Sequence, residues 1–152
     1  MSDRISYHKI APNSATALLA QKKYIDSCSI DPKLRYLVEL RVSQINGCVY
    51  CCDKHSQEAR SVGETQQRLD CLPAWRDCAF FDEREKAALD WAESLTYISK
   101  TGAPDETYNA LHNHFSEIEI VDLTHIIAMM NLWNRLAVAF RMPVAPRKVK
   151  ND

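Results

Sequence analysis

The sequence predicts an all-α protein, a bundle of about six to eight helices that forms a single domain over residues 1–152. Apolar residues recur at steps of three and four, as in Leu34, Val38, Val42 and Ile45, which is the period of a helix with one buried face. The chain has only 3 glycines, and each follows an apolar segment where a helix would end. No run of residues alternates in the manner of a half-buried strand.

Start signals and periodicity together place the helices along the chain. Asp31 and Pro32 read as an N-cap and a first helical residue, and Asp82 stands three residues before Glu85 as in a capping box. The predicted helices cover about 13–27, 32–46, 48–62, 65–78, 82–100, 104–115 and 117–140. We expect Pro73 to kink or divide the fourth helix, because proline lacks the amide hydrogen that an α-helix requires.

The charge balance excludes several classes of partner. Lysine plus arginine number 19 and aspartate plus glutamate number 20, so no strong field attracts nucleic acid or anionic lipid. The first residues lack the apolar run of a secretory signal, and no stretch approaches the roughly 20 apolar residues that span a bilayer. We therefore expect a cytoplasmic protein with no nucleic-acid or membrane partner, whose 6 cysteines are thiols, metal ligands or redox groups before structural disulfides.

Three cysteines and a histidine lie within eight positions of one segment, INGCVYCCDKH, residues 45–55. A helix that begins at or just after Gly47 aligns a stripe of side chains on one face: Cys48, Cys51 or Cys52, His55, Ala59 and Val62. Free cysteine packs as a small hydrophobe, so this stripe has a plain interpretation as core packing.

Three features favour a redox pair over packing alone. Residues three apart on a helix have Cα atoms roughly 5–6 Å apart, inside the range that a disulfide between Cys48 and Cys51 requires. The first turn of a helix stabilises a thiolate and so lowers the pKa of a cysteine. His55 lies one turn after Cys51, where it can accept the thiol proton and return it to a leaving group. Cys52 lies four residues after Cys48 and is an alternative disulfide partner.

A zinc site is a less favoured interpretation of the same residues. Cys48, Cys51 and His55 could supply three ligands. The fourth would be one of the remaining downstream cysteines, Cys52, Cys71 or Cys78. Structural zinc sites usually repeat a close pair of ligands later in the chain, whereas the last two cysteines are seven residues apart with no histidine nearby. We therefore predict neither a metal nor another cofactor.

Two longer segments carry a resemblance to a known family: LVELRVSQINGCVYCCDKHSQEAR and HFSEIEIVDLTHIIAMMNLWNRLAVAFR. With them the chain resembles the alkylhydroperoxidase D-like group of the carboxymuconolactone decarboxylase superfamily, over about residues 30–140. The resemblance implies an all-helical protein, a homo-oligomer (trimer or hexamer), and reduction of peroxides by paired thiols. By position, Cys48, Cys51 and His55 match the two cysteines and the terminal histidine of the family motif.

The sequence departs from the peroxidase pattern at two positions. The family has a glutamate twelve residues before the first cysteine, where this chain has Tyr36, and a histidine between the cysteines, where it has Tyr50. Glu39 lies one turn after Tyr36, about 60° round the helix, so it could partly replace the missing carboxylate. The alternative is that Glu39 is an exposed helix charge. If the relay lacks a carboxylate, Tyr36→Glu should raise the rate.

The resemblance implies a thiol-dependent peroxidase that acts on hydrogen peroxide or a small organic hydroperoxide. We expect Cys51 to attack the peroxide and Cys48 to resolve the product, although the reverse order remains open, and an external dithiol to reset the pair. One rival is a non-catalytic oligomeric protein whose thiols sense oxidants or only pack. Another is a lactone- or β-keto-acid-processing enzyme on the same fold, which should keep its activity after both cysteines become serine.

Overall fold

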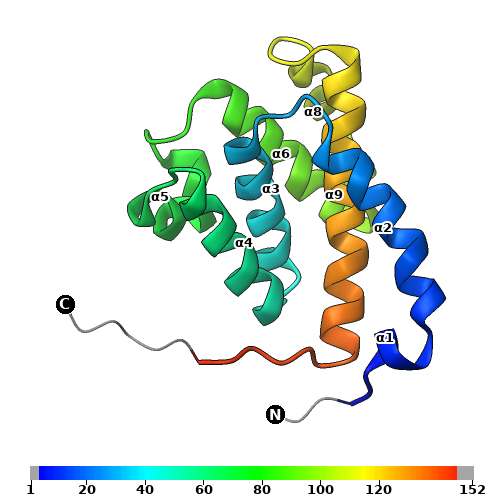
Figure 1. Ribbon diagram of the computed structural model, residues 1–152. Helices are drawn as coiled ribbons and strands as arrows, with labels where there is room; N and C mark the ends of the chain where they lie inside the picture. The colour runs from blue at the N-terminus through cyan, green and yellow to red at the C-terminus, as the bar shows by residue number, and fades with distance from the viewer. Residues whose placement is uncertain (1–3, 147–152) are drawn as a thin grey trace.

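The computed structural model describes residues 4–146, and this part of the chain contains helices and no strand. The all-α fold that the sequence predicts is therefore confirmed (Figure 1). The elements are α1 (Tyr7–Ile10), α2 (Pro12–Asp26), α3 (Pro32–Ile45), α4 (Val49–Ser61), α5 (Gln66–Cys71), the 3₁₀ helix η1 (Leu72–Asp77), α6 (Glu83–Thr96), α7 (Ile98–Thr101), α8 (Asp105–Leu111) and α9 (Glu117–Ala139). Over the described residues, no helix has the length and apolarity needed to cross a membrane.

Two of the predicted helices are divided in the structure. The helix expected at 65–78 becomes α5 and η1, with Pro73 in the first turn of η1 and a non-helical backbone at Ala74, so the predicted break is confirmed. The helix expected at 82–100 ends at Thr96, and the short α7 follows after Tyr97. The four-residue α1 was not predicted, because a single turn carries too little periodicity to detect.

Local capping explains where three of the long helices, α3, α6 and α9, begin. The Asp31 carboxylate accepts hydrogen bonds from the first two free amides of α3, and Pro32 fills the first helical position. Capping boxes start both α6, at Asp82, and α9, at Ser116. Each cap supplies partners for amide groups that a helix start leaves unpaired, and such a cap contributes about 1 kcal/mol.

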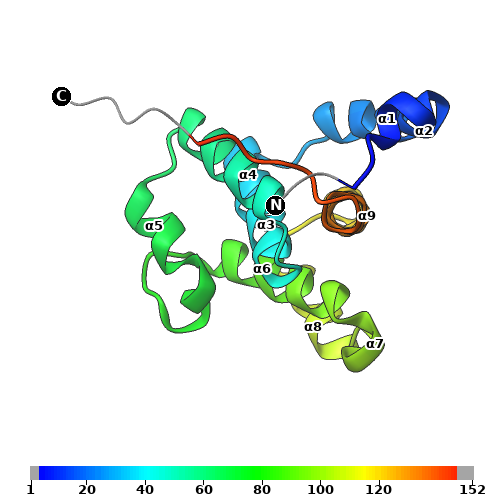
Figure 2. The ribbon, with the colours of Figure 1, turned by 90° about the horizontal axis from the view of Figure 1, so that it is seen from below.

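α3 is the central helix of the bundle and packs against α4, α6 and α9. Figures 1 and 2 show α2 beside α9 on one side of the bundle, with α5 at the opposite edge. Asn46, just after α3, ties this helix to α9, because its side-chain amide donates to Asn131 Oδ1 and to Asn134 Oδ1, each at 3.0 Å.

The buried apolar side chains form two clusters, one on each side of α3 and α4. The first cluster lies towards α9 and includes Cys48 and Cys51. The second cluster lies towards α5 and η1, and Cys52 packs against it. The helix α4 therefore directs consecutive cysteines, Cys51 and Cys52, to different clusters.

Candidate active site

A tight turn between α3 and α4 positions the first cysteine. Gly47 has a φ of +65°, a left-handed conformation that favours glycine, and it ends α3. The amide of Gly47 donates to Gln44 O at 3.2 Å, and the amide of Cys48 donates to Ser43 O at 3.0 Å. These two bonds are those of a Schellman motif. The motif turns the chain so that Cys48 becomes the N-cap of α4.

Cys48 and Cys51 are joined as a disulfide in the structure. Their Cα atoms are 5.3 Å apart, which agrees with the spacing predicted from one turn of helix. The amide of Cys51 also donates to Cys48 Sγ at 3.3 Å, so the first sulfur caps the helix that carries the second. The alternative partner Cys52 is a free thiol.

The disulfide is buried but borders a cavity. Cys48 and Cys51 are only 1% and 3% exposed. Cys51, with Tyr50 and His55, lines a mostly apolar cavity of about 310 Å³, whereas Cys48 does not reach it. The opposite walls come from α2 and α9 and include Leu19, Met129, Met130 and Trp133. Core packing alone therefore does not describe this cysteine stripe, since Cys51 lines a cavity.

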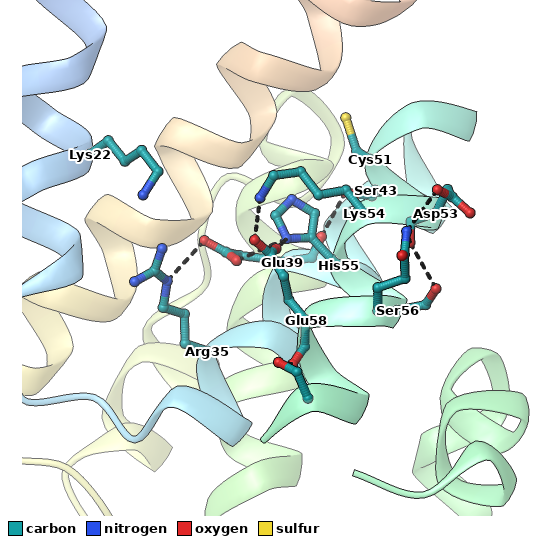
Figure 3. A network of polar contacts seen from close by, with 12 residues as sticks. Lys22, Arg35, Glu39, Ser43, Cys51, Asp53, Lys54, His55, Ser56 and Glu58 are labelled. Carbon is teal, nitrogen blue, oxygen red and sulfur yellow. Dashed lines mark hydrogen bonds and ion pairs between the residues drawn. The ribbon is translucent and has the colours of Figure 1, made fainter. Parts of the chain in front are cut away.

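His55 and Glu39 meet at the wall of the same cavity. His55 Nδ1 lies 3.1 Å from Glu39 Oε2 on α3 and 2.9 Å from Glu58 Oε2, one turn further along α4. Figure 3 shows the Glu39 carboxylate directed at the imidazole ring. Glu39 is only 7% exposed, so the alternative of an exposed helix charge is wrong. The structure thus brings Cys51, His55 and Glu39 to one site.

Two cations hold the outer oxygen atoms of these carboxylates. Arg35 Nε donates to Glu39 Oε1 at 3.1 Å, and another nitrogen of the same guanidinium lies 2.9 Å from Asp26 Oδ1. Lys54 Nζ donates to Glu58 Oε1 at 2.5 Å. Each carboxylate therefore has one oxygen on a cation and the other on His55, which fixes its orientation (Figure 3).

The charged neighbours of His55, Glu39 and Glu58 shift the pKa values of these three groups. Burial opposes the charged imidazole, but the contacts with Glu39 and Glu58 outweigh it, so the pKa of His55 is raised above its ordinary value. Burial likewise opposes ionisation of Glu39, but His55 and Arg35 hold the pKa of that carboxyl below its usual range. Despite its partial burial, contacts with His55 and Lys54 lower the pKa of Glu58 to about 2. At neutral pH the site accordingly holds two carboxylates around an imidazole that readily carries a proton.

Two expectations about neighbouring positions are corrected. Val62, expected on the buried stripe of α4, is 40% exposed, because it follows the last helical residue, Ser61. Tyr36, at the position of the family glutamate, packs against the second apolar cluster and not at the cysteines. The carboxylate that reaches His55 comes instead from Glu39, one turn later.

The potential metal ligands that lie together in the structure are not those of the zinc interpretation. The two sulfur atoms are bonded to each other, and the metal-ligand type groups that the described residues bring together are Glu39, His55 and Glu58, all within 4.8 Å. This set could accept a divalent cation by ligand type. Arg35 and Lys54 already neutralise its carboxylates, however, so the positive charge beside them comes from side chains.

The chain is similar to proteins of a known family. The model of the carboxymuconolactone decarboxylase family matches residues 12–94, which contain the cysteine pair, His55 and Glu39. The chain belongs to this family. The chain is also similar to YdfG, an uncharacterised protein of Bacillus subtilis (strain 168), which is 44% identical over 139 residues, covering 91% of this chain and 95% of the relative.

Solved structures place the chain in the AhpD-like group of the carboxymuconolactone decarboxylase family. A protein of unknown function from Agrobacterium tumefaciens, for which an AhpD antioxidant defence role has been suggested, is 38% identical with a TM-score of 0.93, covering 96% of this chain and 100% of that one. An uncharacterised peroxidase-related protein from Silicibacter sp. TM1040 is 25% identical with a TM-score of 0.76. The match covers 84% of this chain and 68% of that protein's chain.

Sequence reasoning missed three parts of the site. Glu58 is not part of the stripe predicted for this helix, although its position three residues after His55 allows the contact that the structure shows. Arg35 carries a similar signal, since it stands four residues before Glu39 on α3. Trp133 and the rest of the cavity wall on α9 had no signal, because only the tertiary fold brings them to the cysteines.

Proposed function

We propose that the protein is a thiol-dependent peroxidase that reduces hydroperoxides with the Cys48–Cys51 pair. The proposal rests mainly on one observation. Cys51, His55 and Glu39 line the same cavity, and Glu39 contacts His55. A sulfur that can cycle between thiol and disulfide lies there beside a group that can donate a proton. The AhpD and peroxidase-related descriptions of the similar structures support the same chemistry.

The first half of the reaction consumes the peroxide. In the reduced protein, the Cys51 thiolate attacks the terminal oxygen of the hydroperoxide and breaks the O–O bond. The sulfur becomes a sulfenic acid, and the remaining oxygen leaves as an alcohol, or as water from hydrogen peroxide. His55 supplies the proton for that leaving oxygen. We assign the attack to Cys51 because this residue, and not Cys48, lines the cavity.

The second half restores the disulfide and then the thiols. The Cys48 thiolate attacks the sulfenic sulfur of Cys51, the S–S bond forms, and the hydroxyl leaves as water after taking a proton. An external dithiol then reduces the disulfide by exchange, which returns two electrons and two protons to the pair. Glu39 orients His55 and stabilises its charged form through the 3.1 Å contact, so that the ring can donate again in the next cycle.

The shape of the cavity favours an organic hydroperoxide over hydrogen peroxide. About 310 Å³ of mostly apolar space adjoins Cys51, with Leu19, Met130 and Trp133 among its walls. Hydrogen peroxide would leave most of that volume to water, whereas an alkyl or aryl group would bury apolar surface at about 25 cal/mol per Å². The cations near the cavity are already paired, as Arg35 is with Glu39, so an uncharged substrate fits best.

Dithiol consumption tests this proposal directly. The protein should catalyse oxidation of dithiothreitol by cumene hydroperoxide, and Cys51→Ser should abolish turnover. His55→Ala should lower it by about 10²–10⁴-fold, the usual range for general acid–base help. The exposed His125→Ala on α9 is the matched control and should leave turnover unchanged. Peroxide-dependent turnover that survives the double change of Cys48 and Cys51 to serine would overturn the proposal.

We further propose that the protein is a cytoplasmic homo-oligomer, a trimer or a hexamer. The family resemblance supports this, as does a stripe of exposed apolar residues along α9, Ile118, Val121 and Leu132. Such side chains on one helix face are typical of a subunit contact. Native mass spectrometry should show three or six chains, and a single chain at micromolar concentration would contradict the assembly.

A further inference from the structure

Methionine residues are concentrated at the cavity of the candidate active site. The chain has 4 methionines, and three of them line this cavity: Met129, Met130 and Met142. Met129 and Met130 lie on α9 in the same wall as Trp133, and they are only 8% and 5% exposed. Thioether groups that bulk solvent hardly reaches therefore line the same cavity as Cys51.

The third methionine comes to the cavity through the way in which α9 ends. Arg141 has a φ of +52°, which is a left-handed conformation. Its amide donates to Val138 O at 3.2 Å, and the amide of Met142 donates to Ala137 O at 2.9 Å. These two bonds are those of a Schellman motif, which turns the chain back over the last turn of the helix. Met142 thereby lines the same cavity as Ala137.

The disulfide leaves the methionines as the reactive sulfur atoms of the cavity. With Cys48 and Cys51 joined, Cys51 has no thiol with which to attack a peroxide, yet the cavity of about 310 Å³ is present in this state. In the described part of the chain, none of the free cysteines lines it: Cys28, Cys52, Cys71 and Cys78. A hydroperoxide that enters before the disulfide is reduced therefore meets thioethers and no thiol.

We propose that Met129, Met130 and Met142 form an oxidation site, at which an organic hydroperoxide held in the cavity converts methionine to its sulfoxide while Cys48 and Cys51 are disulfide-bonded. The thioether sulfur attacks the terminal oxygen of the hydroperoxide, the O–O bond breaks and an S–O bond forms. The hydroxyl proton of the peroxide passes to the leaving oxygen, which departs as an alcohol. The sulfur loses two electrons and the peroxide gains them, so the step needs no further reductant.

Oxidation changes what the cavity binds. Because the hydroperoxide must enter the same cavity, the oxidation site rests on that part of the proposed function, but it does not need the thiols. Methionine sulfoxide is polar, whereas the cavity around Met130 and Trp133 is mostly apolar. A sulfoxide oxygen in such a wall disfavours an alkyl or aryl group beside it, because that group would bury the oxygen without a hydrogen-bond partner. The KM for an organic hydroperoxide should therefore rise several-fold after oxidation.

Peptide mapping of the disulfide form, treated with cumene hydroperoxide and no dithiol, tests the oxidation site. Trypsin gives separate peptides for the two parts of the site, 101–135 with Met129 and Met130, and 142–147 with Met142. Tandem mass spectrometry of these peptides then reports the sulfoxide at each methionine.

An exposed methionine introduced elsewhere is the matched reference. Ile98→Met places a thioether in peptide 87–100, at a position that is 55% exposed and outside the cavity. Cumene hydroperoxide should oxidise the cavity methionines several-fold faster than this reference, because bound peroxide is held beside them. The preference should disappear with hydrogen peroxide, which has no apolar group to retain it. Faster oxidation of the reference by both peroxides would overturn the proposal.

Filling the cavity and removing the thiols separate this reaction from other causes. Ala15→Trp should slow oxidation of the cavity methionines several-fold, whereas Ala17→Trp, outside the cavity, should not. The variant with Cys48 and Cys51 changed to serine should keep the preference for the cavity methionines. Dithiol-dependent turnover of the wild type with unselective methionine oxidation would overturn the oxidation site alone. Selective oxidation without turnover would overturn the thiol peroxidase alone.

Replacing the three methionines by leucine tests the effect on binding. Leucine keeps nearly the same volume and apolar character but has no sulfur to oxidise. Each protein is treated with excess cumene hydroperoxide and then with dithiothreitol, which restores the thiols and leaves the sulfoxides. The KM for cumene hydroperoxide should rise several-fold in the wild type and stay constant in the leucine variant. An equal rise in both proteins would overturn the assignment to methionine sulfoxide.

Discussion

His55 Nδ1 lies 3.1 Å from Glu39 Oε2, and this contact joins α4 to the central helix α3. The family carboxylate would stand at Tyr36, but that side chain faces the second apolar cluster. Moving the carboxylate one turn along α3 therefore keeps a histidine–carboxylate contact while changing the residue that makes it. The proposed proton relay depends on this contact.

Replacing Glu39 by glutamine should weaken that relay. The amide keeps the size of the side chain but removes the negative charge, so the raised pKa of His55 should fall, as NMR titration of the ring would show. Peroxidase turnover should drop by at least about 10-fold. Glu64→Gln changes another buried carboxylate outside the site and should leave both quantities unchanged. An unaltered His55 titration in Glu39→Gln would contradict the relay.

The lowered pKa of Glu58 predicts a pH-dependent stability. Its pKa is about 2 in the folded protein against an ordinary 4.5, so its ionised form stabilises the fold above pH 4.5. That contribution is lost as the pH falls from 4.5 towards 2. Urea unfolding at pH 6 should therefore show Glu58→Gln to be less stable than the wild type. The difference should shrink steadily at lower pH, and a constant difference would argue against the ion pairs with His55 and Lys54.

Tyr36→Glu should not raise the peroxidase rate. The sequence predicted an increase only if the relay lacks a carboxylate, but Glu39 already contacts His55 and Tyr36 packs against the second cluster. A glutamate there would place a charge beside apolar side chains and lower the melting temperature. Thermal unfolding and steady-state turnover measure the two effects. A faster enzyme would show that a carboxylate at this position reaches His55 after all.

Filling the cavity should discriminate between substrates. Ala15 of α2 lines the cavity and Ala17, on the same helix, does not. Ala15→Trp should raise KM for cumene hydroperoxide several-fold and change the rate with hydrogen peroxide little, because the smaller substrate needs less of the space. Ala17→Trp is the matched control, with neither change expected. Equal losses for both peroxides in Ala15→Trp would mean that the cavity does not select the organic group.

The sequence predicts features that depend on residues close together in the chain better than features that depend on tertiary packing. The caps at Asp31 and Asp82 and the break at Pro73 were predictable, because each involves residues within one turn. The pairing of Cys48 with Cys51 was predictable for the same reason. The direction of Glu39 was left open, because the phase of α3 against α4 is fixed by packing on both apolar clusters and not by any local signal.

Single-turnover trapping is the most direct test of the central claim, that Cys51 is the attacking thiol and Cys48 resolves it. Reduced protein mixed with one equivalent of cumene hydroperoxide should lose two thiols and form the Cys48–Cys51 disulfide. In Cys48→Ser the reaction should stop at a sulfenic acid on Cys51, which dimedone labels for mass spectrometry. A sulfenic acid found on Cys52 instead, or no loss of thiols from the wild-type protein, would contradict the account.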